Sequence, residues 1–93
     1  MAHRLVFRVQ ALQRMSDRQI TVEDVERALA TGEVIEAYPD DHPYPSCLML
    51  GWRGSRPLHV VIAENAEDNE AIVITAYEPD PARWDVTFKR RTS

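Results

Sequence analysis

A histidine and a tyrosine in two apolar runs are the residues of this sequence best suited to moving protons. His59 lies within Leu58–Ala63, and Tyr77 ends Ala71–Tyr77. Histidine ordinarily titrates near neutrality, so an accessible imidazole can act as acid or base. The Tyr77 phenol could orient a phosphate or stack on an aromatic ring. The alternatives are a hydrogen-bonded core residue for His59 and packing at a sheet edge for Tyr77.

Arginines are the second group with a specific binding chemistry. Ten of the eleven basic residues are arginine, whose planar fork binds phosphate or carboxylate through two parallel hydrogen bonds. The candidate phosphate ligands are Arg14 and Arg18, one helical turn apart, and Arg53 before a turn; Tyr44 could cover the same site. An ordinary solvated surface is the alternative. The net charge of −4 argues against non-specific nucleic-acid binding, although basic residues gather near both ends of the chain.

The proline-rich stretch Pro39–Pro45 carries the residues that come nearest to a metal-binding pattern. Asp40, Asp41 and His42 are consecutive in it, and no CxxC, HxxxH or HExxH spacing occurs elsewhere. Prolines lack the backbone donor, so this stretch is predicted to be an irregular connection. We therefore expect no metal site and no other cofactor.

The cysteine content and the hydropathy of the sequence indicate the cellular compartment of the protein. Cys47 is the only cysteine and falls in an apolar strand pattern, which excludes an intramolecular disulfide and predicts a core residue in a reducing cytoplasm. No apolar stretch approaches the roughly 20 residues that span a bilayer. A cytoplasmic protein without a membrane segment is the expectation.

The two apolar runs predict a β-hairpin that positions His59 and Tyr77. The acidic segment Glu64–Glu70 separates them and is unsuited to burial. A turn centred on Asp68 would pair His59 with Tyr77, Val61 with Thr75 and Ala63 with Val73. A turn centred between Asp68 and Asn69 would instead bring His59 near Glu78. Either register gives His59 a polar neighbour.

The remaining elements follow from helical spacing and turn residues. Apolar residues recur at helical spacing over residues 7–18, although Arg4–Arg8 also fits an extended arm. A second helix is expected after a Thr21–Asp24 capping box, ending at Gly32 in the left-handed conformation. Two further strands are predicted; they are Glu33–Tyr38 and Ser46–Arg53. A turn at Arg53-Gly54-Ser55-Arg56 leads into the hairpin.

We therefore predict one domain over residues 1–93 with an α+β fold, in which two N-terminal helices pack on a four-stranded antiparallel sheet. Pro79 and Pro81 stop further pairing, Trp84 is expected to fold back onto the core, and a basic tail is expected to leave it. The second face of the sheet is predicted to be open. Such a face, carrying His59, Tyr77 and Arg53, would suit a single-stranded polyanion.

Four runs of the sequence carry a family resemblance over nearly the whole chain. They are QALQRMSDRQIT, GEVIEAYPDDHPYPSCLMLGW, RPLHVVIA and ITAYEPDPARW. The chain resembles the bacterial domain-of-unknown-function family numbered forty-two fifty-eight, assigned to the RelE/barnase-like superfamily of toxin ribonucleases. The resemblance implies a RelE-like domain that cleaves messenger RNA, with an antitoxin protein as its partner.

Metal-independent RNA cleavage uses the substrate's own 2′-OH as nucleophile and needs a base, an acid and cations around the phosphate. On this hypothesis His59 and Tyr77 transfer protons and Arg14, Arg18 and Arg53 bind phosphate. Family members commonly have histidine where this chain has Gln10. The second hypothesis is therefore a catalytically inactive module of the same fold that binds RNA or a protein.

Overall fold

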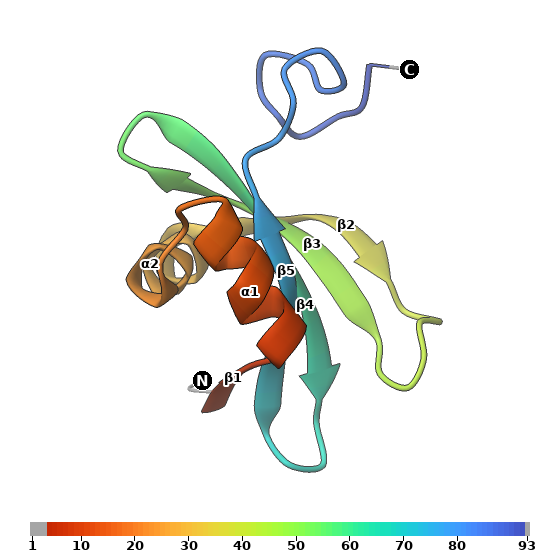
Figure 1. Cartoon of the computed structure of the whole chain (residues 1–93). Coiled ribbons are helices and arrows are strands. Elements are labelled where there is room, and N and C mark those ends of the chain that lie inside the picture. Colours follow the sequence, from red (N-terminus) through yellow and green to blue (C-terminus); the bar gives the residue numbers. More distant parts are fainter. Residues whose placement is uncertain (1–3, 93) are drawn as a thin grey trace.

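The computed structural model describes residues 4–92 and consists of one sheet with two helices on the same side of it (Figure 1). Within this range the elements follow in the order β1 (Arg4–Phe7), α1 (Val9–Asp17), α2 (Val22–Thr31), β2 (Glu33–Tyr38), β3 (Ser46–Arg53), β4 (Arg56–Asn65) and β5 (Glu70–Tyr77). Neither helix of the described part is long and apolar enough to cross a membrane.

The predicted four-stranded antiparallel sheet is wrong, because the described residues form a five-stranded mixed sheet. Its strand order is β1-β5-β4-β3-β2, and β1 pairs with β5 in parallel from Arg4 opposite Glu70 to Phe7 opposite Val73. Leu5 and Phe7 pack against the core, and Arg4 forms an ion pair with Glu70. The extended arm considered for Arg4–Arg8 is thus correct as far as Phe7, but four residues are too few for a periodic signal that would place them in the sheet.

The predicted hairpin is confirmed, and the three pairs farthest from its turn have the register expected for a turn centred on Asp68. His59 lies opposite Tyr77 and Val61 opposite Thr75, as expected for that register. Beyond Val61 the register shifts by one residue, so Ala63 pairs with Ile72 and the predicted pairing with Val73 is wrong. A β-bulge of this kind places one extra residue in β5, and it increases the local twist.

Helix α2 begins as predicted, with a complete capping box. The Thr21 hydroxyl accepts from the Asp24 N–H at 3.0 Å, and the Asp24 carboxylate accepts from the Thr21 N–H at 2.9 Å. Gly32 ends the helix in extended backbone, with φ −79°, so the predicted left-handed conformation is wrong. The helices bury one face of the sheet, and the core they share with it contains Ala11, Met15, Ile20, Val25, Ala28, Leu58, Val60, Ile62, Val73 and Ala76.

The other face of the sheet, predicted to be open, is covered at one end, because residues 79–92 fold back over the part of it that holds His59. Trp84 is buried, as expected, with its ring 4.4 Å from that of His59. The basic tail does not leave the domain: Lys89 forms an ion pair with Glu33, and Arg91 with Glu36, both on β2. These pairs anchor the segment across the sheet, which a local sequence pattern does not reveal.

Candidate functional site

Two adjoining hollows lie at the end of the molecule where β5 finishes and the β3–β4 turn is found. Each has a volume of about 410 Å³, and they share Arg18, Tyr77 and Glu78. The first is completed by Gln19, Ile20, Arg53 and Arg56, and the second by Asp80, Arg83, Trp84 and Arg91. We call the two together the arginine hollow. Among the described residues, its lining contains five arginines against two carboxylates, a balance that attracts anions.

Arg18 is held along the outer edge of β5. Its Nη1 donates to the carbonyl oxygen of Ala76 at 2.9 Å and to Oγ1 of Thr75 at 3.3 Å. The edge is available here because β1 pairs with β5 only as far as Val73. No ion pair within residues 4–92 involves Arg18. Its position is therefore fixed by β5, while its charge has no carboxylate partner there.

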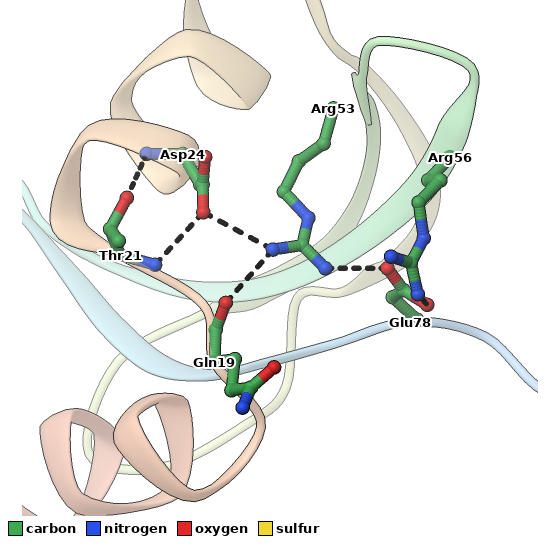
Figure 2. Close-up of polar contacts among 6 residues, drawn as sticks. All are labelled: Gln19, Thr21, Asp24, Arg53, Arg56 and Glu78. Carbon is green, nitrogen blue, oxygen red and sulfur yellow. Dashed lines mark hydrogen bonds and ion pairs between the residues drawn. The ribbon is translucent and has the colours of Figure 1, made fainter.

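Arg53 bridges the start of α2 and the end of β5, and Figure 2 shows its guanidinium between Asp24 and Glu78. Its Nη1 donates to the Gln19 carbonyl oxygen at 3.0 Å and to Asp24 Oδ2 at 3.2 Å, and its Nη2 donates to Glu78 Oε2. Arg56 donates to the other oxygen of Glu78 at 2.7 Å. Arg53 thus uses both terminal nitrogens inside the protein, and any phosphate would compete with two carboxylates for them.

The surroundings of Glu78 and Tyr77 shift the pKa values of these two side chains in opposite directions. Burial acts to raise the pKa of Glu78, but the hydrogen bonds and charges of Arg53 and Arg56 outweigh it, so this pKa lies below its usual range. Burial raises the pKa of the Tyr77 phenol, against the opposing charges of Arg91 and Arg18. At neutral pH the arginine hollow therefore contains an ionised carboxylate and a protonated phenol.

Arg83 and Glu78 are residues of this site that sequence reasoning did not assign to it. The backbone N–H of Arg83 donates to the Asp80 carbonyl oxygen at 2.9 Å, and its side chain forms no ion pair with the described residues. Arg91, in contrast, pairs with Glu36 and lies over the Trp84 ring at 4.7 Å. The signal for Arg83 was its place in the run ITAYEPDPARW directly after β5.

His59 lies beneath the folded-back segment and does not line the arginine hollow. Its side chain is 0% exposed, and Nε2 donates to the Phe88 carbonyl oxygen at 2.8 Å, while Nδ1 has no partner among the described residues. The rings of Trp84 and Tyr77 contact it at centroid distances of 4.4 and 5.5 Å. Burial lowers the pKa of His59, against the hydrogen bond to Phe88. A neutral imidazole shielded from solvent results.

Arg14 and Gln10 lie on the same side of α1 as Arg18, at helical spacing before it. Both are exposed, and neither lines the arginine hollow. Gln10 is thus two helical turns from Arg18, roughly 12 Å along the helix axis at 1.5 Å per residue. Only the end of this arginine row reaches the hollow.

Tyr44 is at the opposite end of the sheet from the other predicted ligands. Its hydroxyl accepts from Nδ2 of Asn65 at 3.2 Å, at the last residue of β4, whereas Arg56 is the first. The nine residue steps between them span roughly 30 Å of strand. The structure therefore brings Arg18, Arg53 and Tyr77 together without Tyr44. Among the described residues, no group of three or more His, Cys, Asp or Glu side chains could hold a metal ion.

The burial of His59 predicts a pH dependence of stability. Because folding lowers the pKa of His59, the unfolded chain binds the proton more readily than the folded protein does. The stability that the neutral imidazole contributes is present above the unfolded pKa of about 6.5 and is lost as the pH falls below that value. We expect the melting temperature of the wild type to drop between pH 7.5 and 5.5, and His59→Gln to show a smaller drop. Equal drops in both proteins would contradict this origin.

Comparison with known proteins gives one match. A family described as Domain of unknown function (DUF4258) matches residues 7–78. No curated protein and no solved structure matches the chain. The match covers both helices, β2 to β5 and Glu78, which is one of the two carboxylates that line the arginine hollow.

Proposed function

This chain belongs to the DUF4258 family, and we propose that it is a metal-independent endoribonuclease of the toxin type, cleaving messenger RNA in the arginine hollow. The carrying observation is that Arg18 and Arg83 line a polar hollow beside Tyr77 and form no ion pair within the described residues. A guanidinium group that forms no ion pair can bind phosphate without first breaking an interaction with a carboxylate.

In the proposed reaction the 2′-oxygen of RNA attacks the neighbouring phosphorus. The P–O5′ bond breaks, leaving a 2′,3′-cyclic phosphate and a 5′-hydroxyl. Arg18 and Arg83 stabilise the negative charge on the non-bridging oxygens. Glu78 accepts the proton of the 2′-OH, and the Tyr77 phenol donates one to the leaving oxygen. At neutral pH Glu78 is ionised and the Tyr77 phenol is protonated, which are the states that these roles require, although each pKa shift moves away from neutrality and so weakens the base and the acid.

His59 has a different place in this proposal from the one expected on sequence alone. It packs against Tyr77 and so orients the phenol. Direct proton transfer by His59 requires Trp84 and the Phe88 carbonyl to move away, since both cover the imidazole.

The wider setting of the proposal rests on the four sequence runs that resemble the family. Kinship with the RelE/barnase-like superfamily, a bacterial source and an antitoxin partner are parts of it that come from that resemblance. A cytoplasmic location, where messenger RNA is found, agrees with the lone unpaired Cys47.

A specific observation favours the second candidate, a binding module without catalysis. The imidazole of His59 is buried, and Gln10 stands where relatives commonly carry histidine. Such a module would use the same arginines to hold RNA but would leave the chain uncut. Binding is common to both candidates, and cleavage separates them.

The test measures RNA binding and cleavage together, in EDTA, with a fluorescent single-stranded RNA. Removing both unpaired arginines in Arg18→Ala/Arg83→Ala is expected to reduce the slope of log affinity against log salt by about 1.4, since each lost phosphate contact contributes roughly 0.7 for single strands. The matched control is Arg27→Ala, an exposed arginine of α2 outside the hollow.

Cleavage by the wild type, and its loss in the double variant, would support the ribonuclease. Binding with an arginine-dependent slope but no cleavage would replace it with the binding module. An unchanged slope in the folded double variant, or an equal change in Arg27→Ala, would reject the arginine hollow as the RNA site.

A further inference from the structure

A hollow beside the proline-rich loop lies on the face of the sheet opposite the helices. It has a volume of about 170 Å³, and its floor is formed by Val61 and Ala63 of β4 and Ile74 of β5. Val61 and Ala63 alternate with the core residues Val60 and Ile62, so their side chains lie on the face away from the helices. The walls include Arg8 and, from the loop that leads into β3, Asp41, His42, Tyr44 and Ser46. We call it the loop hollow.

The size and the aromatic walls of the loop hollow suit one flat ring system. Pockets that enclose drug-sized ligands have volumes of roughly 300 Å³ or more, which this hollow does not reach. Tyr44 is half-buried, and Nδ2 of Asn65 donates to its hydroxyl at 3.2 Å, so the phenol is anchored at the wall. His42 places a second ring, exposed to solvent, in the same lining. A nucleobase has the flat π-face that stacks on such rings.

Arg8 gives the loop hollow a cation. It continues the extended backbone of β1, with φ −69° and ψ 148°, and Phe7 before it packs against the core. The side chain of Arg8 therefore lies on the opposite face, where it lines the hollow. No ion pair within residues 4–92 involves Arg8. Its guanidinium can thus bind a phosphate without breaking a contact with a carboxylate.

The loop hollow and the arginine hollow follow each other along β5. Ile74 lines the first and Tyr77 the second, and the three residue steps between them span roughly 10 Å of strand. Arg8 and Arg18 therefore place positive charge at two neighbouring points of the same strand. Cations that follow one path, with aromatic rings beside it, are typical of surfaces that bind single-stranded nucleic acid.

Asp41 is the carboxylate of the loop hollow, and its charge bears on which base fits. Its Oδ2 accepts from the Ser46 hydroxyl, while Oδ1 has no hydrogen bond or ion pair within the described residues. A carboxylate repels phosphate, so it has to face the base and not the backbone of a nucleotide. It accepts from the exocyclic amino group of cytosine, whereas uracil presents a carbonyl oxygen at that position.

We propose that the loop hollow holds the base of a nucleotide adjoining those bound in the arginine hollow. The base stacks on Tyr44 and donates from its exocyclic amino group to Asp41, and Arg8 binds the phosphate of the same nucleotide. Cytosine is therefore preferred over uracil. The inference rests on the proposed binding of RNA in the arginine hollow, but it holds whether or not the RNA is cut.

The test measures the affinity of the full chain for short 2′-O-methyl oligocytidine and oligouridine, whose blocked 2′-oxygens prevent cleavage. Tyr44→Ala removes the stacking ring and is expected to weaken binding of oligocytidine about tenfold. Tyr44→Phe is its matched control, because it keeps the ring and loses only the hydroxyl, and it should bind as the wild type does. Arg8→Ala is expected to reduce the slope of log affinity against log salt by about 0.7, with Arg27→Ala unchanged.

The choice of base is tested with the same two oligonucleotides. The wild type is expected to bind oligocytidine at least fivefold more tightly than oligouridine. Asp41→Ala should abolish this difference, whereas Ser46→Ala, which keeps the carboxylate, should preserve it. Equal affinity of the wild type for both would overturn the role of Asp41.

Unchanged affinity in Tyr44→Ala, or an equal loss in Tyr44→Phe, would overturn the stacking site. If the salt slope still depended on Arg18 and Arg83 in that case, the arginine hollow would stand without the loop hollow. A wild type that binds neither oligonucleotide would contradict both sites.

Discussion

Replacement of Tyr77 by phenylalanine is expected to lower the single-turnover rate of RNA cleavage about a hundredfold or more and to leave RNA affinity nearly unchanged. The substitution removes only the phenol oxygen, and a positioned proton donor contributes roughly 10²- to 10⁴-fold to such a rate. The ring that packs on His59 at 5.5 Å is retained, so the folded structure should be preserved.

A second tyrosine provides the control for this measurement. Tyr44→Phe removes a phenol that contacts Asn65 at the other end of the sheet, so cleavage by this variant should match the wild type. Cleavage at the full rate by Tyr77→Phe would exclude the phenol from proton transfer. If affinity fell in parallel with the rate, Tyr77 would be a binding residue rather than an acid.

The hairpin that carries Tyr77 could be predicted because its signal is local. Two apolar runs of strand length, separated by a segment that cannot be buried, fix both strands and the register from His59 to Val61. Beyond the bulge after Val61, every pair nearer the turn is shifted by one residue, so Ala63 lies opposite Ile72 and not Val73. No residue type marks that position, since a bulge is decided by how the sheet twists and packs.

The parts of the site that could not be predicted depend on residues far apart in the chain. Arg53 is held by Asp24, 29 residues away, and by Glu78, 25 residues away. Each lies on a different element, so no local spacing reveals that the arginine is already paired. Residue type made both Arg18 and Arg53 candidates for binding phosphate, and the tertiary structure shows that only Arg53 is paired with carboxylates.

His59 illustrates the same limit for burial. Its strand and its neighbour Tyr77 were predictable from alternation. The covering segment was not, because Trp84 and Arg91 reach it through contacts with β4 and β2 that are remote in sequence. Whether a polar residue in an apolar strand belongs to the core or to a functional site can therefore be decided only once the segment that covers its side chain is known.

Gly51→Ala is expected to destabilise the domain strongly for a change of one methyl group. Gly51 lies on β3 where α2 crosses it, and a Cβ added there would lie 2.5 Å from Cβ of Ala28 and 2.6 Å from its Cα and carbonyl oxygen. Two of these three atoms are helix backbone, so α2 must shift as a unit. Overpacking of this kind costs about 1–3 kcal/mol or more, and each kcal/mol lowers the melting temperature of a domain this size by roughly 4–8 °C.

Gly54 provides the control because its requirement is conformational and not steric. It has φ +59° in the β3–β4 turn, and no atom lies within 4 Å of a Cβ added there. Gly54→Asn, which tolerates positive φ, should therefore change stability little. Thermal and urea unfolding of both variants would test the contrast. A Gly51→Ala protein as stable as the wild type would show that α2 does not pack on β3 at this position. The contact between Asp24 of α2 and Arg53 of β3 would then be contradicted as well.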